Sequence, residues 1–336
     1  ISEAVMRCLE KEEVTTLFGY PGGAIMPIYD ALYDFKDTIQ HVLVRHEQGA
    51  IHAAQGFART SGNVGVCFAT SGPGATNLIT GLADAMIDST PVVCVTGQVA
   101  SHLLGTDAFQ ETDVIGISMP VTKWNIQVTK AEDIAPALAK AFYIARTGRP
   151  GPVLVDITKD AQFGMVDLMY EPCVSIRSYS IKPTINQALI EEAAELINHA
   201  KKPYLLIGQG IFLSNAEKEL LAFAEKSGIP VAATLLGLGA FPTDHEQYVG
   251  YLGMHGNYAP NVLTNECDVL IAVGMRFDDR VTGDVSRYAK QAKVIHIDID
   301  KAELNKIIPA EVAIFSTSVS SPSPLISPYF VGSDVM

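Results

Sequence analysis

The sequence predicts an α/β protein with two doubly wound, parallel-sheet domains. Short apolar segments alternate with amphipathic stretches along most of the 336 residues. Several apolar segments are unbroken runs of Val, Ile and Leu, which suit strands buried on both faces of a helix-covered parallel sheet. The length agrees, because a domain has about 150 residues and the chain therefore has room for about two.

The first domain is expected to span residues 1–165. Its strands are expected at 14–18, 41–45, 64–69, 91–96, 124–128 and 152–157. Helical stretches fall between them, at 25–35, 49–60, 75–88 and 132–147. This alternation is typical of βαβ units and predicts a parallel sheet.

Residues 166–184 are expected to form a linker, because the periodicity lapses there. A second domain, residues 185–314, then repeats the alternation, with helices expected at 186–200, 215–228, 259–266 and 301–307 and strands at 203–208, 230–234, 268–274 and 293–298. It reads as incomplete, since residues 309–314 look like the start of another strand. Residues 315–336 are rich in Ser and Pro and are expected to be a disordered, aberrant tail.

Composition excludes several classes of protein. The formal net charge is −13 and no stretch is dense in Lys or Arg, so we expect no nucleic-acid or anionic membrane partner. The apolar runs are far shorter than the roughly 18 residues of a spanning helix. The five cysteines are scattered through apolar segments, which favours core residues in a reducing cytoplasm over a disulfide framework.

Four polar or glycine-rich clusters follow predicted strands of the first domain, at the sheet edge where ligands bind. The turn at 18–24 contains Gly22 and Gly23, and an ordinary βα turn is the alternative for it. Glu47 follows a strand and precedes small, apolar residues. Burial there would make it a proton donor or hydrogen-bonding acid, whereas a pair with Arg45 or a metal site with His46 and His52 are the alternatives.

The third cluster, residues 70–77, combines hydroxyls and glycines with a helix start and could bind an anion. It lacks the Gly-Lys-Ser/Thr ending of a P-loop. The fourth is the loop 97–111, whose length is typical of functional loops. In the second domain, Gly208-Gln209-Gly210 is too short for a full dinucleotide fingerprint. The loop 274–283 contains two arginines and two aspartates, which could grip phosphates or form a solvated salt-bridge cluster.

Together these motifs are more specific than any one of them. The motifs starting at Phe18, Arg45, Thr70, Thr106, Thr147 and Arg276 occur in the order found in acetohydroxyacid synthases, and the sequence resembles that family from Ile1 to about Ile314. These are thiamine-diphosphate-dependent carboligases. The resemblance implies a thiamine pyrimidine-binding domain followed by a flavodoxin- or Rossmann-like FAD-binding domain, here truncated. It implies decarboxylation of pyruvate and transfer of the hydroxyethyl unit to a second 2-ketoacid, in branched-chain amino-acid synthesis.

The resemblance also assigns residues. Glu47 would be the catalytic acid that hydrogen-bonds the aminopyrimidine ring of thiamine diphosphate and favours its imino tautomer. The other cofactor-binding residues would be Tyr20, Gly22, Gly23, Pro73, Asn77 and Gln110. The substrate channel would be lined by Phe109, Lys159, Met254 and Arg280, with Arg280 facing the incoming carboxylate. Ala100 stands where the family commonly has proline, at the channel mouth.

The flavin would contact a larger set by the same resemblance, in a mainly structural role. This set is Arg149, Gly208, Gln209, Gly210, Thr234, Leu235, Leu252, Met254, His255, Gly274, Arg276, Asp278, Arg280, Val281, Asp298 and Ile299. The family usually follows the last strand with Gly-Asp, where this sequence has Phe315-Ser316.

The family binds Mg²⁺ and the diphosphate through a Gly-Asp-Gly segment and a later Asn, and this sequence has no such segment. It is therefore expected to be an N-terminal fragment, without metal ligands of its own and inactive alone. The full-length protein is expected to be a cytoplasmic homodimer or homotetramer, with a possible small regulatory subunit. Another thiamine-diphosphate-dependent decarboxylase or oxidase, or a non-catalytic flavin- or nucleotide-binding fragment, are the alternatives.

Overall fold

The computed structural model describes residues 2–165, 167, 169–179 and 186–316. It divides into two compact units, Ile1–Tyr179 and Ser180–Met336. The predicted linker, 166–184, lies partly outside the described residues. The predicted tail, 315–336, lies outside them from residue 317 onward. Each unit contains one six-stranded sheet, and all the strand pairs within it are parallel. The predicted fold class is therefore confirmed.

The first unit alternates strands and helices as predicted. Its strands are β1 (Thr16–Gly19), β2 (Gln40–Leu43), β3 (Gly65–Ala69), β4 (Val92–Gln98), β5 (Trp124–Val128) and β6 (Val153–Thr158). Its α-helices are α1 (Ser2–Lys11), α2 (Met26–Leu32), α3 (Glu47–Ser61), α4 (Pro73–Asn77), α5 (Ile79–Ile87), α6 (Val114–Ser118), α7 (Ile134–Arg146) and α8 (Lys159–Phe163). Short 3-10 turns lie at Tyr33–Phe35, Ser101–Leu103, Met119–Val121 and Ala131–Asp133.

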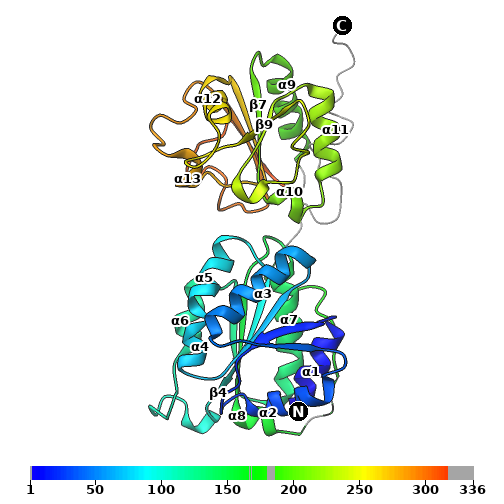
Figure 1. Cartoon of the computed structure of the whole chain (residues 1–336), viewed down its shortest axis with the longest axis vertical. Coiled ribbons are helices and arrows are strands. Elements are labelled where there is room, and N and C mark those ends of the chain that lie inside the picture. The colour runs from blue at the N-terminus through cyan, green and yellow to red at the C-terminus, as the bar shows by residue number, and fades with distance from the viewer. Residues whose placement is uncertain (1, 166, 168, 180–185, 317–336) are drawn as a thin grey trace. The chain divides into compact units, whose positions relative to one another are not determined.

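The first sheet has the order β2-β1-β3-β4-β6-β5. Its central strands β3, β4 and β6 are buried along their whole length, as their apolar sequences predict. Helices cover both faces (Figure 1), with α3 and α5 packed together on one face and α1 and α7 on the other. The apolar sides of α3 and α5 meet β3 and β4 in a core that includes Ile51, Leu82 and Cys94.

The second unit has a sheet of the order β12-β11-β10-β7-β8-β9. Its strands are β7 (Pro203–Ile207), β8 (Val231–Ala233), β9 (Tyr248–Tyr251), β10 (Val269–Val273), β11 (Lys293–Asp298) and β12 (Val312–Phe315). Its helices are α9 (Gln187–His199), α10 (Gly210–Leu213), α11 (Glu217–Ser227), α12 (Tyr258–Glu266) and α13 (Asp279–Thr282), with a 3-10 turn at Leu235–Gly237. One core packs under α9 and α11 and a second under α12.

Three expectations need correction. The helix expected at 301–307 is wrong, because these residues form turns. Asp298 and Asp300 use their carboxylates to accept the N–H groups of Asp300 and Ala302 at 2.8 and 2.9 Å, and such local bonds compete with a helix. Residues 235–258, where no strand or helix was expected, contain β9, a half-buried strand at the sheet edge. Residues 309–314, expected to start another strand, contain β12, which begins only at Val312 and ends at Phe315, a residue expected in the tail.

Candidate functional site

The first candidate site lies where the chain reverses its winding direction in the first sheet. β1 and β3 are neighbours, and the turns that follow them leave the sheet at the same edge, which is where doubly wound folds bind ligands. The two turns touch. A Cβ atom on Gly22 would lie 2.5 Å from Cβ of Thr70, and Thr70 Oγ1 accepts the N–H of Ala24 at 3.2 Å.

Glu47 opens α3 directly after β2. His46 caps this helix, because its Nδ1 accepts the N–H of Gln48 at 3.2 Å. The Glu47 side chain is buried, with 8% exposure. Its Oε2 accepts a hydrogen bond from Nδ2 of Asn77 at 2.9 Å. The described residues contain no ion pair between Glu47 and Arg45, so Glu47 is not paired with Arg45 in this structure.

The turn after β3 reaches the same carboxylate from the other side. A Cβ atom on Gly74 would lie 3.3 Å from Oε1 of Glu47 and 2.8 Å from Cγ2 of Thr70. Pro73 begins α4, and Asn77 ends it. We call Glu47, Asn77, Gly74, Thr70 and Gly22 the Glu47 site.

Gln110 also belongs to this region. A Cβ atom on Gly72, where φ is +57°, would lie 2.6 Å from the carbonyl oxygen of Gln110. Gly23 has no atom within 4 Å of its Cβ position, so its outer side is open. Tyr20 is partly exposed, and its N–H faces Phe68 O at 3.4 Å.

The predicted substrate channel is not assembled within one unit. Phe109 is 87% exposed, and Lys159 is exposed at the start of α8. Met254 and Arg280 belong to the second unit. Thr70 and Gly74 lie in the hydroxyl- and glycine-rich cluster 70–77 of the sequence, but neither was among the predicted cofactor-binding residues. A hydroxyl residue directly after a buried strand, before a glycine turn, was the available signal for Thr70.

The second candidate site lies at the corresponding edge of the second sheet. From β9 the strand order is β9-β8-β7-β10-β11-β12, which is the 3-2-1-4-5-6 order of dinucleotide-binding folds with its reversal between β7 and β10. Gly208 and Gly210 follow β7, and Gly274 follows β10. A Cβ atom on Gly208 would lie 2.3 Å from Gly274 O, and Gly210 N donates to the same oxygen at 2.9 Å.

The arginine-rich loop forms a short helix beside that edge. Asp278 caps α13 by accepting the N–H groups of Arg280 and Val281 at 3.0 and 3.2 Å. Arg276 lies 3.8 Å from the Asp278 carboxylate. Met254 N donates to Arg280 O at 2.7 Å, and Nη1 of Arg280 faces Met254 Sδ at 3.5 Å. The loop is therefore bonded into the fold, although Arg280 and Asp279 remain solvated.

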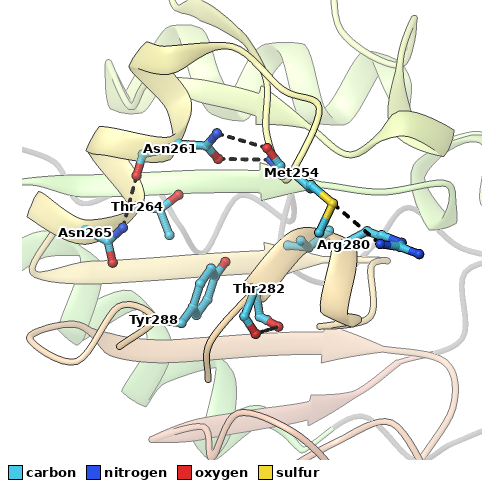
Figure 2. A pocket seen from close by; sticks show the side chains of 10 residues that line it. Met254, Asn261, Thr264, Asn265, Arg280, Thr282 and Tyr288 are labelled. Atoms are coloured by element: carbon cyan, nitrogen blue, oxygen red, sulfur yellow. Dashed lines mark hydrogen bonds between the residues drawn. The ribbon is translucent and has the colours of Figure 1, made fainter. Parts of the chain in front are cut away.

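A pocket of about 300 Å³ opens between α12 and α13 (Figure 2). Three predicted flavin contacts line it, namely Met254, Arg280 and Val281. The remaining lining residues were not among the predicted flavin contacts, although two of them end the loop 274–283; they are Gly253, Asn261, Thr264, Asn265, Thr282, Gly283 and Tyr288. Asn261 holds the rim by bonding both backbone groups of Gly253 at 3.0 Å. The buried hydroxyl of Tyr288 has no hydrogen-bond partner among the described residues.

Other predicted flavin contacts also follow strands of the second sheet. Thr234 N donates to Ile207 O at 2.9 Å, and Leu252 N donates to Ala233 O at 3.0 Å. Asp298 ends β11, with Ile299 after it. Gln209 precedes α10, and Leu235 is exposed. His255 accepts a bond from the hydroxyl of Tyr251 through its carbonyl oxygen.

Arg149 lies in the first unit, where it donates to Ser89 Oγ at 2.8 Å and to Ile87 O at 3.1 Å. Its predicted flavin contact, like the others, stays a prediction.

Two family profiles match the two units. Residues 1–117 match the profile described as thiamine pyrophosphate enzyme, N-terminal TPP binding domain, and residues 190–319 match thiamine pyrophosphate enzyme, central domain. The chain belongs to the thiamine pyrophosphate enzymes. The description of the second profile names no flavin.

Among these thiamine pyrophosphate enzymes, the chain is similar to acetolactate synthase large subunits. It is 54% identical over 313 residues to the one from Corynebacterium glutamicum, covering 93% of this chain and 50% of that protein. It is 52% identical over 310 residues to the isozyme 2 large subunit of Escherichia coli, covering 92% and 56%. A probable large subunit from Methanocaldococcus jannaschii is 52% identical over 316 residues, covering 93% and 53%. The chain thus spans about half the length of these relatives.

The Glu47 site fits the pyrimidine half of thiamine diphosphate, the cofactor of the thiamine pyrophosphate enzymes. It offers the buried carboxyl group of Glu47. Asn77 bonds its Oε2, and its Oε1 faces Gly74, which has no side chain to fill the space. We call the turns after β7 and β10, with Gly208, Gly210 and Gly274, the β7/β10 edge. It likewise fits a nucleotide, because the backbones of these glycines approach one another so closely that a Cβ atom on Gly208 or Gly210 would collide.

No cluster of three or more His, Cys, Asp or Glu side chains suited to a metal exists in the described ranges. None of the described helices is long and apolar enough to cross a membrane.

Proposed function

We propose that this chain provides the pyrimidine-binding and central domains of an acetolactate synthase. The enzyme decarboxylates pyruvate and joins the resulting two-carbon unit to a second 2-ketoacid. The buried Glu47 carboxyl beside the glycine turns is the observation that supports this function. The relatives that are named acetolactate synthase large subunits give the same indication.

Each residue of the Glu47 site has a task in this proposal. When bound, thiamine diphosphate supplies the reactive carbon and the electron sink for loss of carbon dioxide. Glu47 shares a proton with the aminopyrimidine ring in surroundings that exclude water, where a hydrogen bond is strong. Asn77 fixes one carboxylate oxygen, which leaves the other free to face the ring. Gly74 keeps the space beside that oxygen clear, while Gly22 lets the turn after β1 pack against Thr70, whose hydroxyl accepts the N–H of Ala24.

FAD is proposed for the β7/β10 edge, with its diphosphate near Gly208, Gly210 and Gly274. Arg280 lines the adjoining pocket together with Tyr288, whose hydroxyl has no partner in the part of the chain that the structure describes. Since joining two ketoacids involves no net oxidation, the flavin would serve mainly as a structural element. Mg²⁺ is proposed as the ion that binds the diphosphate of the thiamine cofactor.

The whole protein is proposed to work in the cytoplasm as a homodimer or homotetramer. A small regulatory subunit is a further proposed partner, since the relatives are named large subunits. That the 336-residue polypeptide forms no acetolactate by itself stays a prediction.

The test is product analysis with pyruvate, thiamine diphosphate, Mg²⁺ and FAD, using an active enzyme that contains these residues. We expect acetolactate, and we expect Glu47→Gln to lower its rate at least about a hundredfold, as loss of an acid–base group does. Glu192→Gln, an exposed position on α9, is the matched control. Acetaldehyde as product would favour a decarboxylase. Flavin binding with no effect of Glu47→Gln on any activity would favour a flavin-binding protein.

A further inference from the structure

The loop between β4 and α6 contains a turn that its own residues do not favour. Glu111 N donates to Ala108 O at 2.9 Å, which closes a turn with Phe109 and Gln110 in the middle. Gln110 has a φ of +58° and Asp107 has a φ of +56°. Residues other than glycine rarely adopt this left-handed backbone conformation, and it persists only where other contacts hold it.

The carboxylate of Glu111 provides such contacts. It accepts the N–H groups of Gly105, of Thr106 at 3.2 Å and of Ala108 at 3.1 Å. Amides that converge in this way form a nest for an anion, and here the chain fills the nest with its own acid. These bonds, led by the one from Gly105, hold the pKa of the Glu111 carboxyl below its usual range.

The two ends of the loop are fixed separately. Ser101 donates from N and Oγ to the Asp160 carboxylate at 2.8 and 2.5 Å. Gln98 Nε2 donates to Thr112 O at 3.0 Å and to the buried Asp156 carboxylate at 3.1 Å. The amides that donate to Glu111 all lie between these ends, in residues 105–110, and the N–H of Thr106 also donates to Leu103 O at 3.2 Å.

That segment includes both predicted site residues of the loop. The Gln110 carbonyl lies against Gly72, next to the Glu47 site. Phe109 is 87% exposed, so little packing of its own holds its ring. The backbone of the turn therefore sets the positions from which both side chains extend.

We propose that Glu111 is a positioning residue, which folds the loop around its carboxylate and so holds Phe109 and Gln110 beside the Glu47 site. The purpose of that placement rests on the proposed function. The folding of the loop around Glu111 does not.

The experiment compares the polypeptide with its Glu111→Ala and Glu111→Gln variants, in the absence of any cofactor. Amide hydrogen exchange is measured at residues 105–108, and a fluorine label on the ring of Phe109 reports its surroundings by NMR. We expect the amides of both variants to exchange roughly ten- to hundredfold faster, since charge-assisted hydrogen bonds to them are lost. Glutamine should not rescue, because it offers one acceptor oxygen in place of two. We also expect the fluorine signal to shift and broaden.

Glu132→Ala is the matched control, at an exposed glutamate in a 3-10 turn of the same unit. Adding Gln110→Gly to Glu111→Ala should recover part of the lost protection, since glycine adopts the left-handed conformation without strain. Unchanged amide exchange and an unchanged fluorine signal in Glu111→Ala would overturn the proposal. Because neither readout uses thiamine diphosphate, a failure of cofactor binding would count against the proposed function alone.

Discussion

Nδ2 of Asn77 donates to Oε2 of Glu47 across 2.9 Å, although 30 positions separate the two residues. The bond joins the end of α4 to the start of α3, and so links the segments that follow β2 and β3. It uses one oxygen of a buried carboxylate and leaves Oε1 facing Gly74. The side of the carboxylate available to a ligand is thus decided by an amide from another element.

Asn77→Ala should destabilise the first unit by about 1.5–3 kcal/mol, because it leaves a buried carboxylate oxygen without its partner. Urea unfolding measures this change. Thr76→Ala is the control, since its hydroxyl bonds only locally, to Pro73 O. In a double-mutant cycle with Glu47→Ala, the two changes should be coupled by about 0.5–3 kcal/mol. Simple additivity would show that the bond contributes nothing.

Gly22→Ala should destabilise the first unit by about 1–3 kcal/mol, as overpacking does in a tight site. Its new methyl would lie 2.5 Å from Cβ of Thr70, close to the backbone, so a side-chain rotation cannot relieve the clash. Gly23→Ala is the matched control, with no atom within 4 Å of its Cβ position. Thermal unfolding of both variants tests this difference, and equal melting temperatures would contradict it.

Gly208→Ala should loosen the β7/β10 edge and abolish the flavin binding that we propose for it. The added Cβ atom would lie 2.3 Å from Gly274 O, which belongs to the backbone and is already bonded to Gly210 N. The flavin absorption of the purified protein and the unfolding of the second unit are the two measurements. A variant that retains flavin at the level of the unchanged protein would show that this edge does not bind the nucleotide.

The second unit should lose stability in mild acid because of His296. This residue is fully buried, and its Nε2 donates to Met275 O at 2.9 Å, while Nδ1 has no partner in the described structure. Burial lowers the pKa of His296 below the ordinary 6.5. Below pH 6.5 the unfolded chain therefore binds a proton that the folded chain does not. Stability falls by up to about 1.4 kcal/mol per pH unit until the folded pKa is reached.

Denaturant unfolding between pH 7 and pH 5, roughly the range of histidine titration, measures this loss. His296→Gln should remove the pH-dependent part, because an amide can still donate to Met275 O and does not titrate. His199→Gln, at an exposed position of α9, should leave it unchanged. The same loss in the His296→Gln variant would assign the effect to another group.

The contact between Asp160 and Ser101 should persist in stronger acid. Burial alone would raise the pKa of Asp160, but the bonds from the Ser101 hydroxyl and N–H outweigh it and lower the pKa to about 2. The stabilisation is present above pH 3.8, the ordinary value, and is lost as the pH falls from there toward 2. Carboxyl NMR titration measures this pKa. Ser101→Ala should move it upward, and an unchanged value would contradict the assignment.

Much of the fold followed from local patterns. The strands at 124–128 and 293–298 have the predicted bounds. In the first, Trp124, Ile126 and Val128 alternate with polar residues, and in the second Val294, Ile295 and Ile297 are β-branched, and both patterns favour a strand. The edge strand β9 was missed, since its half-buried residues include Gly250 and follow no apolar alternation. The helix expected at 301–307 failed because Asp side chains there bond to nearby backbone amides.

By itself the sequence determined the α/β class and the edge of each sheet at which polar residues gather, because a parallel strand must deliver its following residues to one edge. It also placed Glu47, Gly208 and Gly274 at those edges. The tertiary structure decided which groups meet there. The bond from Asn77 to Glu47 and the contact of Gly22 with Thr70 depend on distances between elements remote in sequence. So does the lack of a partner for the Tyr288 hydroxyl among the described residues. Periodicity and spacing report only a residue's own element, so contacts of this kind appear only after the sheets have assembled.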